Sequence, residues 1–167
     1  MTVRVAVAMP ERVASLPLPK MAETRQPQAD AQLADGAALA RGWLESSPFV
    51  AHLGIRIELM EPDRAVLSMP FADTLPTIGD VVHGGAISSL VDTAAAAAAW
   101  SGADIPERPR ASTVGITVDF LRPARAQGVR ADAGVVRRSG RGLCFCEVKV
   151  AAEDGTPVAT ALVTYQL

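Results

Sequence analysis

One almost uncharged segment in the middle of the chain constrains the fold more than any other part of the sequence. Residues 82–100 open with a histidine and two glycines, contain six consecutive alanines and end in Trp100. From residue 84 onward this pattern predicts a long helix that is apolar all round, and such helices are normally buried. The helix contains one acid, Asp92, and an unpaired buried carboxylate is costly. Asp92 therefore needs a partner, a water-lined cleft or a function.

Helical and strand-like periods follow one another along the chain in an order that indicates the fold class. Residues 30–45 have helical spacing up to Ser46-Ser47-Pro48, residues 55–60 and 64–70 read as strands, and residues 72–82 form a loop before the long helix. Four further strands joined by short turns are expected over 112–121, 129–138, 143–151 and 157–166. Short turns join antiparallel neighbours. The sequence thus predicts an α+β protein whose antiparallel sheet of five to six strands wraps around one central helix.

The first part of the chain differs in composition from the rest. Residues 1–28 are rich in proline, glutamine and charge and are expected to form a flexible leader, whereas residues 29–167 form a single domain. The apolar stretch at residues 5–9 is too short for the core of a signal peptide. His83 and Asp92 argue against a membrane span at the long helix. A cytoplasmic protein without a membrane partner is expected.

Composition excludes several further classes of function. Sixteen basic and eighteen acidic residues give a net charge of −2, which does not suggest a nucleic-acid partner. Cys144 and Cys146 share one face of an expected strand but lie about 6.5–7 Å apart, at or beyond the reach of a disulfide. The two histidines elsewhere are too few to complete a metal site with them. We therefore expect packed thiols, no metal and a reducing compartment.

The long helix also bears on assembly. It carries apolar residues beyond the face that one sheet can cover, and burying the remainder requires another surface. A homodimer is therefore expected.

His83-Gly84-Gly85 precedes the first turn of the long helix, where backbone N–H groups have no partner within the helix. Free donors at the positive end of the helix dipole suit an oxygen that develops negative charge, as in an oxyanion hole. In the alternative interpretation the glycines only start a helix beneath a crowded sheet, and His83 is a structural hydrogen-bonding residue.

Asp92 lies nine residues beyond His83, which is about 13 Å along a helix axis. The two residues cannot form one compact site within a single chain. If two subunits pack with their long helices antiparallel, Asp92 of one faces the Gly84 region of the other. A partly desolvated carboxylate opposite oxyanion donors could attack an ester-like carbonyl, directly or through water. The alternative is a buried acid satisfied by a neighbouring hydroxyl or backbone N–H.

These residues resemble the signature of hot-dog fold acyl-CoA thioesterases of the phenylacetate-pathway (PaaI-like) type. The resemblance rests on His83-Gly84-Gly85 and the run at residues 90–94, and covers about residues 43–167, including segments 49–55, 119–124 and 138–141. It implies a hot-dog domain that pairs into a dimer, and often then into a tetramer.

The resemblance also implies roles for individual residues. Asp92 matches the general base or nucleophile, and Gly84 matches the residue whose N–H polarises the thioester carbonyl, with Gly85 beside it. His83 matches the histidine that shapes this corner, and Thr113 matches a hydroxyl residue that helps to hold the attacking water.

Two further segments correspond to family positions. Arg138, Ser139, Gly140 and Arg141 match a turn near the nucleotide end of coenzyme A, where guanidinium groups suit phosphates; the alternative is a solvated hairpin turn. Thr77 stands where many members have an asparagine that orients the water or the carbonyl, and Asp80 replaces a residue that is commonly glycine.

The leading hypothesis is therefore a thioesterase that hydrolyses an acyl-CoA to the free acid and coenzyme A, with no metal or redox cofactor because coenzyme A is part of the substrate. The runner-up is a non-catalytic acyl-CoA-binding or sensing protein, which the missing asparagine favours. A hot-dog hydratase would need an Asp/His pair closer together than His83 and Asp92. Aromatic and medium-chain acyl groups both remain open, as do the dimer and the tetramer.

Overall fold

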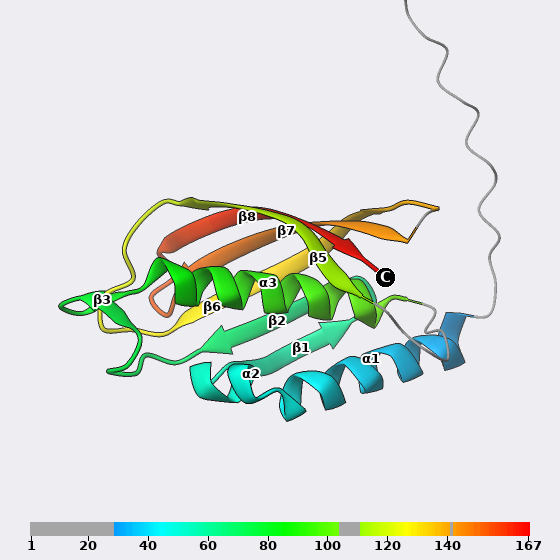
Figure 1. The fold of residues 1–167 in the computed structure, drawn as a ribbon, viewed down its shortest axis with the longest axis horizontal. Helices are drawn as coiled ribbons and strands as arrows, with labels where there is room; N and C mark the ends of the chain where they lie inside the picture. The colour runs from blue at the N-terminus through cyan, green and yellow to red at the C-terminus, as the bar shows by residue number, and fades with distance from the viewer. Residues whose placement is uncertain (1–28, 104–110, 141) are drawn as a thin grey trace, which may run out of the picture.

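The computed structural model describes residues 29–103, 111–140 and 142–167. Its main feature is a six-stranded antiparallel sheet that curves around helix α3 (Gly84–Ser101) (Figure 1). In spatial order the strands are β1 (Arg56–Glu61), β2 (Arg64–Met69), β6 (Val129–Arg138), β7 (Leu143–Ala152), β8 (Pro157–Gln166) and β5 (Ser112–Phe120). The predicted α+β fold is confirmed, and the leader expected over residues 1–28 lies outside the described residues.

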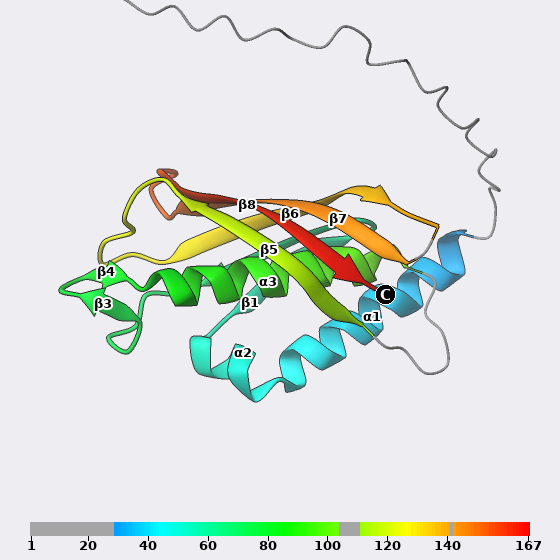
Figure 2. The same ribbon diagram turned by 45° about the horizontal axis from the view of Figure 1, so that its top comes forward.

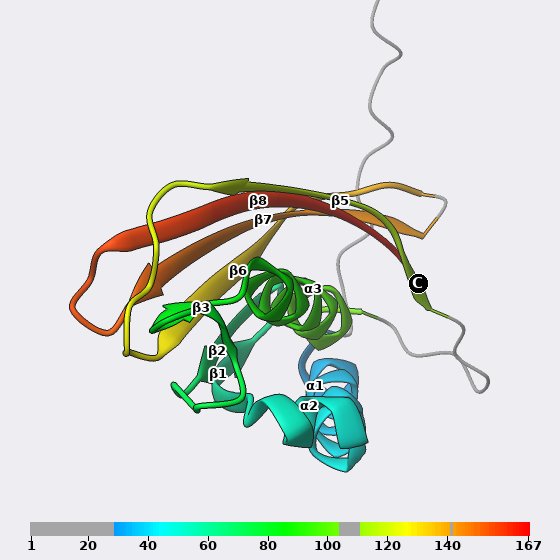
Figure 3. The same cartoon turned by 60° about the vertical axis from the view of Figure 1, so that its left-hand side comes forward.

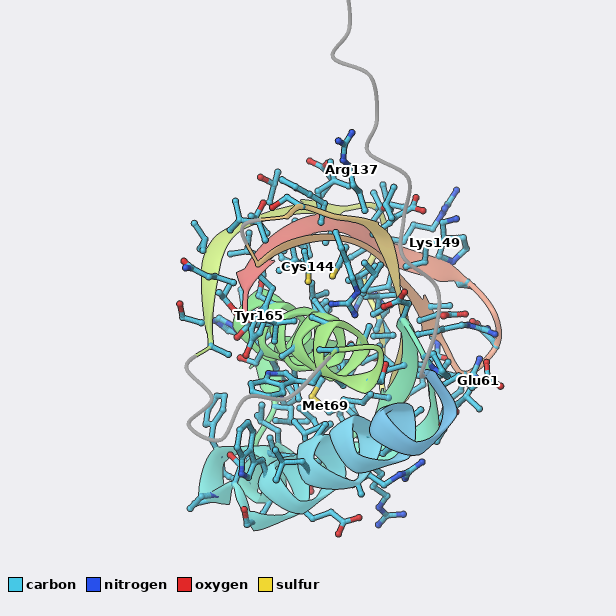
Figure 4. All side chains as sticks on the ribbon, turned by 90° about the vertical axis from the view of Figure 1, so that its right-hand side faces the viewer. Glu61, Met69, Arg137, Cys144, Lys149 and Tyr165 are labelled. Carbon is cyan, nitrogen blue, oxygen red and sulfur yellow. The ribbon has the colours of Figure 1, made fainter. Side chains whose placement is uncertain are left out.

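Strand β7 shows how sequence alternation builds the core. Every second residue from Cys144 to Val150 is buried, and the residues between them face outward. Figure 4 shows Cys144 and Tyr165 on the helix side of the sheet and Lys149 on its outer side. Both thiols are free and buried, and burial raises the pKa of Cys146 to about 11. The cysteines are packed thiols, as predicted.

Helix α3 forms the centre of the core through mostly small side chains. Its fully buried residues include Leu90, Val91, Ala94, Ala95, Ala98 and Ala99. Small residues allow the sheet to approach closely, and the Cys146 Sγ atom lies 3.8 Å from the carbonyl oxygen of Ala95. The face of α3 that stays partly exposed carries Ser88, Ser89, Asp92, Thr93 and Ala96.

Helix α1 (Ala29–Ser46) covers the side of α3 that faces away from the sheet (Figure 3). The rings of Trp43 and Trp100 meet edge to face with their centroids 4.6 Å apart. This packing alters the sequence argument for a dimer, because α1 of the same chain covers apolar surface that we expected a second subunit to bury. The homodimer stays a prediction. No helix among the described residues is long and apolar enough to cross a membrane.

One short helix and one short hairpin were missed at the sequence level. Helix α2 (Pro48–Leu53) begins at the Ser-Pro pair that was expected only to end the preceding helix, because Ser47 caps it and Pro48 suits a first helical position. Strands β3 (Pro76–Ile78) and β4 (Val81–Val82) form a hairpin inside the segment expected as a loop. They are too short to show an alternating pattern.

The buried helix gives a stability prediction. Leu90→Ala should lower the free energy of unfolding by about 2–5 kcal/mol, because it leaves a cavity between α3 and the sheet. Leu162→Ala, on a side chain that is 66% exposed, is the matched control and should change it by less than about 0.5 kcal/mol. Urea denaturation measures both. Equal effects would contradict the assignment of α3 as the centre of the core.

Candidate active site

The start of α3 is fixed by His83. Its Nδ1 atom accepts a hydrogen bond of 2.7 Å from the Gly85 N–H, and its own backbone N–H donates to the Leu75 carbonyl at 2.8 Å. Because Nδ1 accepts, the ring proton of a neutral His83 is on Nε2. The Gly85 N–H is therefore engaged within the chain, whereas that of Gly84 has no hydrogen-bond partner among the described residues. Of the two predicted oxyanion donors, Gly84 is the one left open.

A side chain would be crowded at each of the two glycines, by a different neighbour. A Cβ atom on Gly84 would lie 3.2 Å from the Cζ atom of Phe120, whose ring covers that residue. A Cβ atom on Gly85 would lie 2.9 Å from the Nδ1 atom of His83, closer than side chains approach. Gly84 thus accommodates a ring from β5, and Gly85 accommodates the histidine cap.

Asp92 has a defined partner. The Thr113 hydroxyl, from the start of β5, donates to the Asp92 Oδ1 atom at 2.5 Å. Asp92 is half-buried, so it is neither a sealed core acid nor a freely solvated one. The structure thus brings together two predicted site residues, and it also shows the neighbouring hydroxyl that the structural alternative required.

Two residues behind this pair were missed at the sequence level. Tyr165 lies directly across from Thr113 in the pairing of β8 with β5, and its hydroxyl accepts a hydrogen bond of 3.1 Å from the Trp100 indole. Burial raises the pKa of Tyr165, and the charge of Asp92 raises it further. The phenol therefore stays protonated at neutral pH. No sequence signal identifies it, because its position depends on strand register.

The two halves of the predicted site are separate within one chain. Gly84 and Asp92 lie eight residues apart on α3, about 12 Å along the axis. Strand β5 runs across α3 (Figure 2), with Phe120 beside Gly84 near one end and Thr113 beside Asp92 near the other. The separation of the glycine motif from Asp92 that the sequence predicted therefore holds within one chain.

The hairpin before His83 holds the two residues that depart from the family pattern. Thr77 is exposed and lies at the irregular position of the β3–β4 pairing. Asp80 forms an ion pair of 2.7 Å with Arg125, and its carbonyl accepts from the Ala126 N–H at 2.9 Å. The Asp80–Arg125 ion pair therefore links the hairpin to the loop after β5.

Arg138 faces inward. Its guanidinium pairs with Asp63 in the β1–β2 turn, and it donates to the Ala99 carbonyl at 2.8 Å and to the Cys144 sulfur at 3.0 Å. These bonds tie the C-terminal end of α3 to the sheet, a role that the sequence did not indicate. Ser139 accepts from the Leu143 N–H at 3.3 Å, Gly140 is exposed, and Arg141 lies outside the described residues.

Cavities identify two other surfaces. A cavity of about 440 Å³ lies beside the turn after β6, between Ser139 and the end of α3 at Gly102. A larger one of about 670 Å³ lies on the outer side of the sheet, and none of the predicted site residues lines it. Its charged residues include the Arg130–Glu58 ion pair. Within the described part of the chain, no group of three or more His, Cys, Asp or Glu residues is placed to hold a metal ion.

Comparisons with known proteins identify the family. Residues 79–159 match the family described as Thioesterase superfamily. A thioesterase family protein from Silicibacter pomeroyi has 31% identity and a TM-score of 0.71, over 80% of this chain and 96% of that one. The chain belongs to the thioesterase superfamily and has its hot-dog fold, as the sequence predicted.

Two further similarities concern proteins with more specific names. The E. coli PaaI protein from the phenylacetic acid degradation operon has 26% identity and a TM-score of 0.69, over 80% of this chain and 94% of that one. The medium/long-chain acyl-CoA thioesterase YigI of Salmonella typhimurium is 27% identical over 135 residues, which cover 72% of this chain and 85% of that protein.

Arg138 provides a test of the inward-facing network. Arg138→Gln should reduce the free energy of unfolding by about 1–2 kcal/mol, because partly buried charged hydrogen bonds to Asp63 and the end of α3 are lost. Arg137→Gln, on the exposed neighbour, should leave it nearly unchanged. Thermal denaturation of both variants measures the effect. Equal melting temperatures would exclude a structural role for the Arg138 side chain.

Proposed function

We propose that this protein is a thioesterase that hydrolyses an acyl-CoA to the free acid and coenzyme A, with Asp92 as general base or nucleophile. The observation that carries the proposal is the half-buried Asp92 carboxylate on an otherwise apolar helix, oriented by the Thr113 hydroxyl at 2.5 Å. A carboxylate held in a partly dry site can accept a proton from water or attack a carbonyl itself.

The proposed site is shared between two chains. Strand β5 is an edge strand of the sheet, and its Val114 and Ile116 side chains are 58% and 43% exposed. A twofold axis near the middle of β5 would pair this strand with its copy in antiparallel orientation. The Gly84 end of one subunit would then meet the Asp92 end of the other.

In this arrangement the residues have distinct tasks. The Gly84 N–H donates to the thioester carbonyl oxygen, and the His83 ring holds the first turn of α3 in place through its hydrogen bond from Gly85. Asp92 of the partner subunit takes a proton from water as the water oxygen bonds to the carbonyl carbon. The tetrahedral intermediate then breaks its C–S bond, and the sulfur of coenzyme A leaves with the proton that Asp92 returns.

Coenzyme A is proposed to extend toward the turn formed by residues 138–141. Arg138 and Ser139 of that turn border the cavity at the C-terminal end of α3. This end lies ten residues, or about 15 Å, from Asp92, a distance that an extended pantetheine arm can span. Because the Arg138 side chain is committed to Asp63, we assign phosphate contacts to Ser139, Gly140 and Arg141, with Arg138 as their support. Thr77 is proposed to contact the substrate from the hairpin at the entrance.

The acyl group is proposed to be medium-chain or aromatic. YigI is named for medium and long acyl chains, and PaaI comes from a phenylacetic acid operon. The proposed chemistry uses no resident cofactor. It also fits a cytoplasmic protein, because acyl-CoA substrates occur there and the two thiols are unbridged.

A second candidate function is acyl-CoA binding or sensing without turnover. The observation in its favour is Thr77, a short side chain on an exposed hairpin where many relatives have an asparagine. A binding protein would retain ligand affinity and show no Asp92-dependent hydrolysis.

Asp92→Asn tests the catalytic role. It should lower kcat for acyl-CoA hydrolysis by about a hundredfold or more, because a general base contributes about 10²–10⁴-fold. KM should change little. Asp119→Asn, on the exposed outer face of β5, is the matched control and should retain wild-type kcat. A thiol-release assay on a panel of acyl-CoAs measures both. Hydrolysis unaffected by Asp92→Asn would exclude this mechanism.

The shared site predicts that assembly is required for activity. Ile116→Lys places a charge on the exposed edge of the sheet and should convert a dimer into monomers, with loss of hydrolysis. Leu162→Lys, on the outer face of β8, is the control for an added lysine and should keep the dimer pairing. Size-exclusion chromatography with light scattering gives the mass. A fully active monomer would show that the site does not need two chains.

A further inference from the structure

Phe120 is an aromatic residue in an unusual position. In the β5–β8 pairing it lies opposite the buried Ala159, which places it on the helix side of the sheet, yet its side chain is 55% exposed. Three atoms of its ring lie 3.2–3.7 Å from the point where a Cβ atom on Gly84 would be. One part of the ring therefore packs on Gly84, and the remainder is open.

The contact matters because of what Gly84 offers. Its N–H has no hydrogen-bond partner among the described residues and lies at the positive end of α3. A carbonyl oxygen bonded to it lies about 2.9 Å from the nitrogen. The first carbon of the acyl chain is attached to that carbonyl carbon. In the proposed binding mode this carbon lies close to the residue on which the Phe120 ring packs.

We propose that Phe120 determines acyl specificity by limiting the width of the acyl pocket at the carbon next to the thioester carbonyl. This inference rests on the proposed function, since it takes Gly84 as the carbonyl donor. In this proposal the ring accommodates an unbranched CH₂ group and excludes an additional methyl group on that carbon. The Phe120 ring limits branching rather than chain length, because it packs on Gly84, the residue that is proposed to bind the carbonyl oxygen.

The test compares two isomeric substrates, hexanoyl-CoA and 2-methylpentanoyl-CoA, which have the same acyl composition and differ in branching. The wild-type protein should prefer the straight chain. Phe120→Ala should lower the ratio of the two kcat/KM values by about tenfold or more, since one methyl group in an apolar pocket changes specificity by about 10–200-fold. Phe120→Leu should lower it by less, and it keeps an apolar side chain should the alanine variant fold poorly.

Phe145→Ala is the matched control. Its side chain is 40% exposed, but it lies on the outer face of β7, so the ratio should stay at the wild-type value. An unchanged ratio in both Phe120 variants, with activity retained, would overturn the inference and leave the thioesterase proposal intact. A changed oligomeric mass with an unchanged ratio would do the same and would assign Phe120 to the subunit interface. Absence of hydrolysis by the wild-type protein on every acyl-CoA would instead remove the proposed function.

Discussion

Helix α3 is enclosed by the curved sheet on one side and by α1 on another, and the positions of the site residues depend on this enclosure. Its alanines allow close packing, and the Trp43–Trp100 contact fixes α1 against its end. Only one face remains partly exposed, and the hydroxyls of Ser88, Ser89 and Thr93 on that face donate to carbonyls of the preceding turn. Asp92 is the charged residue on this face. The packing that buries the rest of the helix therefore leaves its one carboxylate partly exposed.

The edge strand β5 relates this acid to the start of the helix. Thr113 and Phe120 both lie on the helix side of β5, and they contact Asp92 and Gly84 respectively. One strand thus positions a hydrogen bond to the carboxylate and a ring beside the oxyanion donor. These contacts are about 12 Å apart along α3, so the Gly84 and Asp92 of one chain cannot act on the same carbonyl group. An antiparallel copy of β5 would instead bring the Asp92 of the second subunit to the Gly84 of the first. Strand geometry therefore supports the proposed dimer more directly than exposed apolar surface on α3, much of which α1 covers.

The sequence predicted the elements whose patterns are long and regular. The helix at α3 and strands β5 to β8 were found within one or two residues, because alternation and helical spacing are local properties. The short α2 helix and the β3–β4 hairpin were missed, because a few residues cannot display a period. The site divides in the same way. His83, Gly84 and Asp92 could be selected from a motif, whereas the partners of Arg138 could not, because Asp63 and Ala99 are distant in sequence and meet it only after the sheet has formed.

The His-Gly-Gly motif illustrates how far a local pattern reaches. Helix geometry alone makes the two glycines a pair of backbone donors at a helix start, and only the family resemblance assigns the carbonyl to Gly84. In the structure they differ, because the Gly85 N–H is taken by His83 and a side chain there would collide with the cap. The Gly84 N–H has no hydrogen-bond partner among the described residues, and a Cβ atom there would lie only 3.2 Å from the Phe120 ring. The His83 ring is therefore part of the same arrangement, because its Nδ1 atom is the acceptor for the Gly85 N–H. The motif thus combines a histidine cap, an N–H donor without a partner among the described residues, and a glycine surface on which a ring packs. The ring belongs to Phe120 of β5, which lies far along the chain.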